Sequence, residues 1–327
     1  MKEKKGSVIL NTIFRKRETG ILIPLIIVFV FSGIMNPKFF TYQNISNILF
    51  QASFVAIIGV AMTFVLILAG LDLSVGSVLG LCGVITGYAL LNGVPIPFAI
   101  MIGLLTGMGI GLFNGYIIAK LKMPTFIVTL SSMYIARGMC EFLTRGEPVY
   151  PLPKVFNAIG QGRLMIGKFA VQWPVIIAVV FAVIGHLVLT RTTFGRAVFA
   201  IGGNRETARL SGIKVVKTSV IVYMLASMCA AASGIVTAAR LGSALSNAGT
   251  GMEMNVIASC IIGGTSMFGG SGSILGTMIG ALLMTTVTNS MAMLRVSVFL
   301  QKVVIGAIIL IAVGIDQYNR KRSGLGS

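Results

Sequence analysis

Long apolar runs with almost no charge constrain this chain more than any other feature of its sequence. Only 10% of its 327 residues are charged, whereas soluble domains carry about 25%. A helix needs about 20 mainly apolar residues to cross a membrane, and about ten runs approach that length. Their approximate limits are 20–36, 47–69, 75–91, 97–119, 124–143, 173–190, 218–239, 253–268, 273–293 and 296–315. The runs are continuous, unlike the alternating strands of a β-barrel, and predict an all-α polytopic membrane helix bundle.

The excess of basic residues predicts how this bundle is oriented. Lys and Arg number 26 against 8 acidic residues, which gives a formal net charge of +18. Cytoplasmic loops carry such an excess, and ten spans place most of it on the side of both termini. We therefore expect both termini in the cytoplasm, with 1–19 a basic N-terminal segment, 20–315 the transmembrane domain and 316–327 a tail. No zinc spacing or RNA-binding signature accompanies the charge, so nucleic acid is not an expected partner.

Residues that carry enzymatic or metal chemistry are scarce in the apolar runs. The cysteines Cys82, Cys140, Cys229 and Cys260 form no C-x-x-C pair and are interpreted as packing residues. We expect no catalytic residue and no bound metal. Ion-coupled carriers usually need ionisable groups inside the membrane, and no carboxylate pair or histidine relay is evident. The sequence favours a path for an uncharged, hydroxylated solute powered by another protein, with an ion-coupled secondary carrier as the alternative.

Two glycine- and serine-rich breaks interrupt the runs in similar ways. Residues 67–80 and 261–276 each contain an apolar helix end, a polar break and a G-S-x-L-G restart. Interrupted helices line polar paths in transporters, so we interpret the pair as an internal repeat. Candidate translocation-path or gate residues are Asp72, Ser74, Ser77, Asn114, Thr265, Ser266 and Asn289. An inner gate or a helix cap is preferred for Asp72. Interhelical hydrogen bonding is preferred for Asn114 and Asn289, with a role in the path as the alternative.

A glycine stripe recurs every fourth residue at Gly103, Gly107, Gly111 and Gly115, and a shorter one begins at Gly272. This spacing places the glycines on one helix face, where another backbone can approach closely. Helix packing is the preferred interpretation, and a sliding face between moving helices is the alternative.

The connection 191–217 contains a short helix with its own capping residues. Asn204 suits the N-cap, Glu206 lies in the first turn and Gly212 can end the helix. A helix of about two turns is too short to be stable alone, so it must pack on something. Two interpretations remain open: a basic loop lying on anionic headgroups, or a docking helix for a cytoplasmic partner.

Four sequence motifs stand in order along the chain. They are LAGLDLSVGSVLG (68–80), GLFNGYIIAKLKMPTFIVTLSSMYIARG (111–138), G-G-N-x-x-x-A-R-L-S-G-I within 194–213, and IIGGTSMFGGSGSILGTMIGALL (261–283). Together they resemble the ribose/galactose/xylose-type ABC sugar-importer permeases over about residues 20–315. The resemblance implies a subunit of the bacterial cytoplasmic (inner) membrane that translocates a monosaccharide, a pentose or hexose. A permease for branched-chain amino acids is the alternative, which these motifs fit less well.

The resemblance also implies partners and a coupling helix. A cytoplasmic ABC ATPase would hold ATP and Mg, since this chain has no Walker A motif and would bind no cofactor itself. An extracytoplasmic sugar-binding protein would dock chiefly on the loop 144–172, and a second permease subunit, identical or related, would complete the path. The implied ATPase-coupling residues are Gly202, Gly203, Asn204, Arg205, Glu206, Ala208, Arg209, Leu210, Ser211 and Gly212.

Overall fold

The computed structural model describes residues 19–167 and 169–322. Its elements are α2 (Thr19–Met35), η1 (Pro37–Phe40), α3 (Tyr42–Ile67), α4 (Val75–Leu91), α5 (Ile96–Lys120), α6 (Thr125–Thr144), α7 (Lys154–Gln161), β1 (Arg163–Ile166), β2 (Phe169–Gln172), α8 (Trp173–Arg191), α9 (Thr193–Gly203), α10 (Arg205–Leu210), α11 (Val215–Leu241), α12 (Met252–Ile262), α13 (Ile274–Met293) and α14 (Val298–Arg322).

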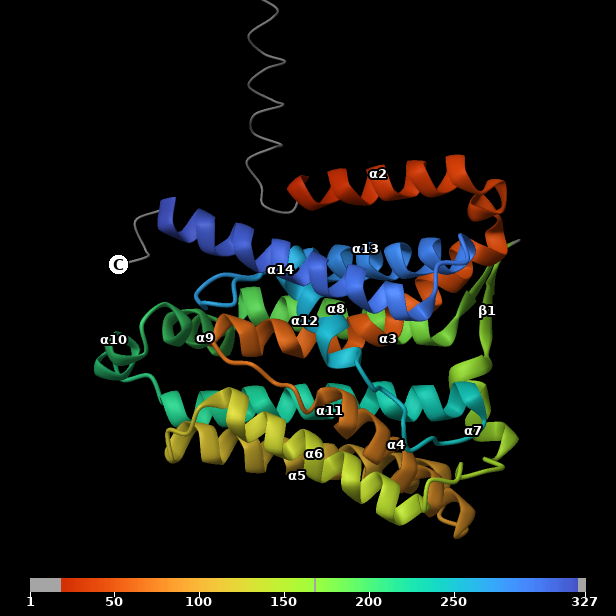
Figure 1. Ribbon diagram of the computed structural model, residues 1–327. Coiled ribbons are helices and arrows are strands. Elements are labelled where there is room, and N and C mark those ends of the chain that lie inside the picture. Colours follow the sequence, from red (N-terminus) through yellow and green to blue (C-terminus); the bar gives the residue numbers. More distant parts are fainter. Residues whose placement is uncertain (1–18, 168, 323–327) are drawn as a thin grey trace, which may run out of the picture.

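The long helices lie side by side and give the bundle two distinct ends (Figure 1). At the first end, called the α10 end, α9 and α10 lie beside the connections that follow α3 and α12. At the second, called the α7 end, lie η1, α7 and the antiparallel β1–β2 hairpin, in which Arg163 pairs with Gln172. Helix α3 forms the centre, buried along most of its length among α8, α11, α12 and α13.

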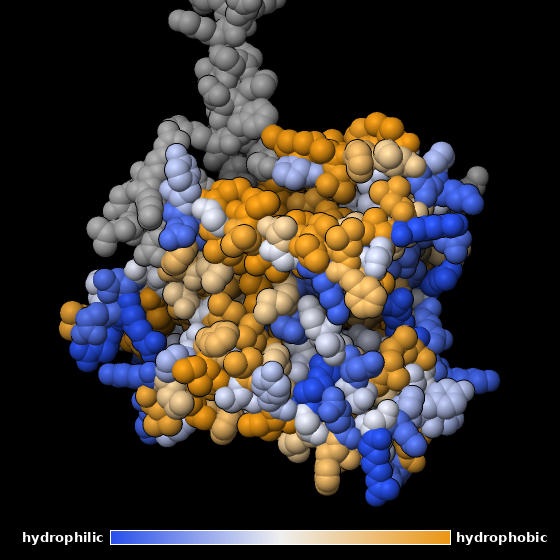
Figure 2. Space-filling model, in the orientation of Figure 1, coloured by the Kyte–Doolittle hydropathy of each residue, from blue (hydrophilic) through white to orange (hydrophobic). Residues whose placement is uncertain are grey.

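The apolar runs form the helices of this bundle, though not all reach the length of a full span. In the described chain, α3, α5, α6, α8, α11, α13 and the Val298–Tyr318 part of α14 are long and apolar enough to cross a membrane. Ile21–Met35, α4 and α12 are shorter apolar helices in the positions of the three remaining runs. Apolar side chains cover α2 and α14 in Figure 2, and polar side chains gather near the two ends. The all-α bundle is confirmed, while the orientation of the termini stays a prediction.

Both breaks begin with the same backbone ending. After α3, Ala69 takes a left-handed φ of 57°, and the Gly70 amide donates to the Val65 carbonyl at 3.0 Å. After α12, Gly264 takes a φ of 83°, and the Thr265 amide donates to the Cys260 carbonyl at 2.9 Å. Each is a Schellman ending, which satisfies late helical carbonyls and stops the helix. The predicted run 253–268 therefore ends as a helix at Ile262, and the shared ending supports the interpretation as a repeat.

The glycine stripe of α5 is a packing face against α4 and α11. A Cβ at Gly111 would meet the Tyr223 carbonyl and lie 2.7 Å from the Met224 Cα, and one at Gly115 would lie 2.8 Å from the Val220 Cα. Such contacts let two backbones approach more closely than any larger residue allows. The preferred packing interpretation is confirmed for this stripe.

Candidate functional site

Helix α10 projects from the bundle (Figure 1), and all of its side chains except that of Ala208 are exposed. The Asn204 side chain accepts from the Thr207 amide at 2.9 Å, which caps the first turn as predicted. Glu206 and Arg209 form an exposed ion pair at 2.6 Å, and the hydrogen bond from Arg209 lowers the pKa of the Glu206 carboxyl. Ala208 packs inward beside Ile201 and Val215.

The outer face of α10 has few partners within the chain. Leu210 is 76% exposed although it is a large apolar residue. Lys122, Arg205 and Arg209 line a cavity of about 710 Å³ between α10 and the start of α6. Gly212, with φ of 81°, reverses the chain after the helix. This geometry is typical of a projecting helix to which a second protein can bind.

Helix α9 connects α10 directly to both breaks. The Gly270 amide of the second break donates to the carbonyl of Ile67, the last residue of α3, at 2.9 Å. Gly202, near the end of α9, lies against that same carbonyl, so that any Cβ there would clash with it. Gly269 in turn lies against the Gly202 carbonyl, with 2.7 Å between that oxygen and a Cβ built on Gly269. The last turn of α9 therefore contacts both breaks at the point where the two breaks contact each other.

The first break leads into a buried polar network. Asp72 is fully buried, and its Oδ1 accepts from the Ser74 amide at 2.9 Å and from the Ser74 hydroxyl at 2.6 Å. The Asn114 amide of α5 donates to the Ser74 hydroxyl at 3.2 Å, and its Oδ1 accepts from Ser132 of α6. Ser77 is buried in the first turn of α4. The structure therefore joins Asp72, Ser74 and Asn114 into one network that links α4, α5 and α6.

The second break is tied to the last helix. Asp316 of α14 accepts from the Ser266 hydroxyl at 2.9 Å and from the Met267 amide at 3.2 Å. Thr265 is buried, and its hydroxyl has no hydrogen-bond partner in the described chain. The predicted residues of this break lie together, whereas Asn289 lies toward the α7 end and donates to Asn44 at 3.0 Å.

Helices α4 and α12 begin inside the bundle rather than at its ends (Figure 1). Helix α12 has 11 residues and rises about 16 Å, roughly half of a hydrocarbon core about 30 Å thick. Because α12 finishes near the α10 end of the bundle, its first residue lies about halfway across the hydrocarbon core. Gly76, the second residue of α4, packs against Gly249 and the Glu253 carboxylate at this level. Two helix N-termini, each with a positive dipole end, thus meet in the middle of the bundle.

Arg137 of α6 holds this meeting point together. Its guanidinium donates to the carbonyl of Ser246, to that of Ala248 at 3.0 Å and to that of Gly76 at 3.4 Å. Backbone carbonyls without helical partners need such donors inside a membrane. Arg137 therefore fixes the 243–251 connection against the start of α4.

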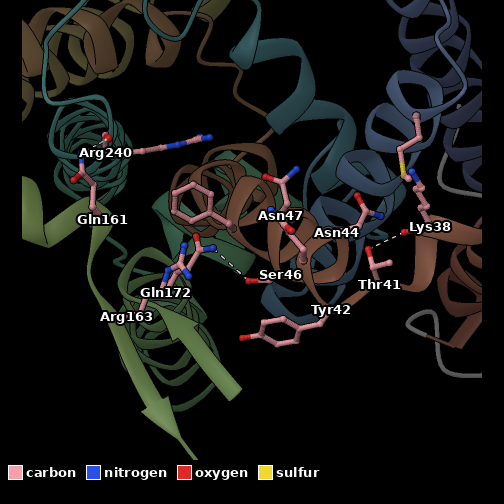
Figure 3. Close-up of a pocket in the computed structure, with 13 residues that line it drawn as sticks. Lys38, Thr41, Tyr42, Asn44, Ser46, Asn47, Gln161, Arg163, Gln172 and Arg240 are labelled. Carbon is pink, nitrogen blue, oxygen red and sulfur yellow. Dashed lines mark hydrogen bonds between the residues drawn. The ribbon is translucent and has the colours of Figure 1, made fainter. Parts of the chain in front are cut away.

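A polar cavity of about 770 Å³, called the first cavity, opens at the α7 end. Figure 3 shows Arg240 reaching from α11 toward α3, with Asn47 and Ser46 across from it. The hairpin forms one wall: Tyr42 donates to the Ala170 carbonyl at 2.8 Å and accepts from its amide at 2.7 Å, and Gln172 donates to Ser46 at 3.3 Å. The cavity is lined by amides, hydroxyls and three basic residues.

Sequence reasoning missed the first cavity. One signal was present, since Gln43, Asn47 and Gln51 recur every fourth residue within an otherwise apolar run and share one helix face. Further lining residues come from α3 itself and from η1, α7, the hairpin, α11 and α13, most of which are far apart in the sequence. No group of three or more potential metal ligands occurs among the residues that the structure describes.

Comparisons with known proteins agree with this architecture. Residues 44–313 match the family described as branched-chain amino acid transport system / permease component. The ribose import permease protein of Escherichia coli is 40% identical over 92% of this chain and 93% of its own length. The xylose transport system permease protein of Haemophilus influenzae is 35% identical over 91% and 95%, and the ribose import permease protein of Bacillus subtilis 39% over 94% of both. No solved structure matches.

The chain is thus a multi-pass membrane permease, the transport subunit of an ABC importer and not its ATPase. It belongs to the permease family that includes the ribose and xylose proteins, to which it is similar over more than nine tenths of its length. The family resemblance expected from the four sequence motifs is confirmed.

Proposed function

We propose that this permease imports a monosaccharide, a pentose or hexose, driven by ATP that a partner ATPase hydrolyses. The relatives named for ribose and xylose support the class of solute. The observation that carries the mechanism is the contact of α9 with both breaks through Gly202, Ile67 and Gly270. ATP and Mg lie on the ATPase.

The α10 end faces the cytoplasm in this proposal. The segment 191–217 carries six basic residues, namely Arg191, Arg196, Arg205, Arg209, Lys214 and Lys217, as cytoplasmic connections do. The ATPase binds the exposed face of α10. Leu210 enters an apolar pocket of the ATPase, and the Glu206–Arg209 pair lies at the rim of that pocket. Movement of α10 passes through α9 to the breaks, and the bundle alternates between outward and inward access.

The α7 end then faces the extracytoplasmic side. A sugar-binding protein docks on α7 and the hairpin, within the predicted loop 144–172, and releases its sugar there. A second permease subunit pairs with this chain. Asp72, Ser74, Ser77, Asn114, Thr265 and Ser266 form the inner gate region, because they lie in or against the breaks that α9 contacts.

The experiment is uptake into proteoliposomes that contain this chain, its copurifying ATPase and the binding protein. Labelled D-ribose, D-xylose, D-galactose and L-leucine are tested with ATP inside. Sugar uptake that needs all three components and ATP is the expected result. Uptake of L-leucine but of none of the sugars would show that the solute is an amino acid and not a monosaccharide. Uptake by this chain alone under a proton or sodium gradient would overturn the ABC mechanism in favour of a secondary carrier.

A further inference from the structure

We propose that the first cavity and a smaller cavity below it form a binding site for one uncharged monosaccharide within a single permease chain, with Arg240 between them. The inference rests on the proposed function for the identity of the solute. It adds a site on α3 and α11 that neither the breaks nor α10 contain.

The second cavity continues the first toward the middle of the bundle. Its volume is about 200 Å³, and its lining includes Gln51 of α3, Asn255 of α12, and Thr285 and Thr288 of α13. Asn255 lies one turn into α12, close to the level where the starts of α4 and α12 meet. The two cavities therefore lead from the α7 end toward the half-way point of the membrane.

Arg240 lines both cavities. Its guanidinium carbon lies 4.3 Å from the ring centroid of Phe50 and 5.5 Å from that of Phe54, within the range of a cation–π contact. Phe50 lines the first cavity and Phe54 the second. Gln161 of α7 holds the Arg240 carbonyl at 2.9 Å. A solute that moves from one cavity to the other must pass this guanidinium and the two rings.

The polar stripe of α3 joins the two cavities. Gln43 and Asn47 line the first, and Gln51, one turn on, lines the second. Gln51 donates to the Asn47 Oδ1 at 3.2 Å, and no group in the described chain accepts the Asn47 amide protons. Side-chain amides offer both donors and acceptors, as sugar hydroxyls do, while the rings of Phe50 and Phe54 match the apolar face of a sugar.

The charge of the lining selects against cations. The residues that line the two cavities include Lys38, Arg163 and Arg240 but no acid. A fixed positive charge along a pore is an electrostatic barrier to cations and protons. A volume of about 770 Å³ lies within the roughly 300–1,000 Å³ typical of small-molecule sites. The chemistry fits a neutral polyol that is imported without a leak of ions.

The test uses a thiol reporter in the complex of this chain with its ATPase, in nanodiscs and without binding protein. The four native cysteines are buried, so Asn47→Cys reports on the first cavity and Gln51→Cys on the second. Each is labelled with an anionic and with a cationic methanethiosulfonate reagent, with and without millimolar D-ribose or D-xylose. Val155→Cys, on the exposed face of α7, is the control outside both cavities.

We expect the anionic reagent to label Asn47→Cys faster than the cationic one by about tenfold, the effect of a nearby unit charge. Arg240→Gln should reduce that preference, because only Lys38 and Arg163 then remain in the lining, whereas Lys154→Gln, which removes an exposed charge at the same end, should leave it unchanged. Sugar should slow labelling at Asn47→Cys and Gln51→Cys but not at Val155→Cys. If Asn47→Cys does not fold, Gln51→Cys carries the same test.

The outcomes separate the two proposals because uptake is measured on the wild-type complex. Uptake without sugar protection at either reporter overturns the site and leaves the function standing. Protection without ATP-driven uptake upholds the site and overturns the function. A result with no sugar protection and no ATP-driven uptake would overturn both proposals.

Discussion

Gly202 is the residue at which α9 meets the breaks. A methyl group there would clash with the Ile67 carbonyl and lie 2.8 Å from the Gly270 amide nitrogen, and these two groups are hydrogen-bonded to each other where α3 ends. Gly202→Ala should therefore lower the thermal midpoint of the purified permease, since overpacking costs about 1–3 kcal/mol. It should also lower the number of sugars imported per ATP, because the junction is displaced.

Gly203 provides the matched control for stability. A Cβ at this adjacent position meets nothing within 4 Å, so Gly203→Ala should keep the wild-type midpoint. Equal midpoints for the two alanine variants would contradict the close contact between α9 and the breaks.

Arg137 is the second residue whose substitution should lower the stability of the protein. Arg137→Gln removes donors to the carbonyls of Ser246, Ala248 and Gly76, and each buried group left without a partner costs about 1–3 kcal/mol. Thermal unfolding should show a clear loss of stability. Lys154→Gln, at an exposed position at the start of α7, should show no loss. Unchanged stability of Arg137→Gln would mean that the starts of α4 and α12 meet without help from α6.

At the scale of elements, the α5 stripe makes a simple prediction. Gly111→Ala should destabilise the α5–α11 contact by about 1–3 kcal/mol, because the added carbon meets the Tyr223 and Met224 backbone. Gly109→Ala, two residues away with nothing within 4 Å, should be neutral. Unfolding of both variants in detergent measures the difference, and equal stability would contradict the packing of this face.

The helices themselves were largely predictable from the sequence, because long apolar runs leave few alternatives to membrane helices. The cap at Asn204 and the two glycine-rich breaks were predictable from local residues. The residues could not indicate that the two breaks contact each other. Ile67 and Gly270 are about two hundred residues apart in the sequence, and no local pattern predicts that they pair. The half-length of α12 was missed because its apolar run continues past Ile262 to Phe268, while the chain turns at Gly264.

The candidate site was predicted only in part. Asp72, Ser74 and Asn114 meet in one network because α5 passes the first break, and Thr265 and Ser266 share the second. Asn289 was grouped with them as a candidate path residue, but α13 carries it to the α7 end, where it donates to Asn44 across helices. The first cavity was missed because single polar residues from several elements build its walls.

At the scale of the whole molecule, helix α9 joins the projecting helix α10 to both internal breaks. In the proposed mechanism, the ATPase binds at the α10 end, helices α4 and α12 with their breaks form the movable centre, and the α7 end receives the solute. The contact chain from α10 through α9 to Ile67 and Gly270 joins the first two parts.

The most direct measurement is ATP-driven sugar uptake by proteoliposomes that carry Leu210→Asp. Leu210 is 76% exposed, so the variant should fold as the wild type does, while a buried charge in the ATPase contact should reduce uptake by roughly tenfold or more, equivalent to about 1.4 kcal/mol of binding. Tyr318→Asp, an exposed position near the end of α14, is the control and should import normally. Wild-type uptake by Leu210→Asp would contradict the assignment of α10 as the coupling helix.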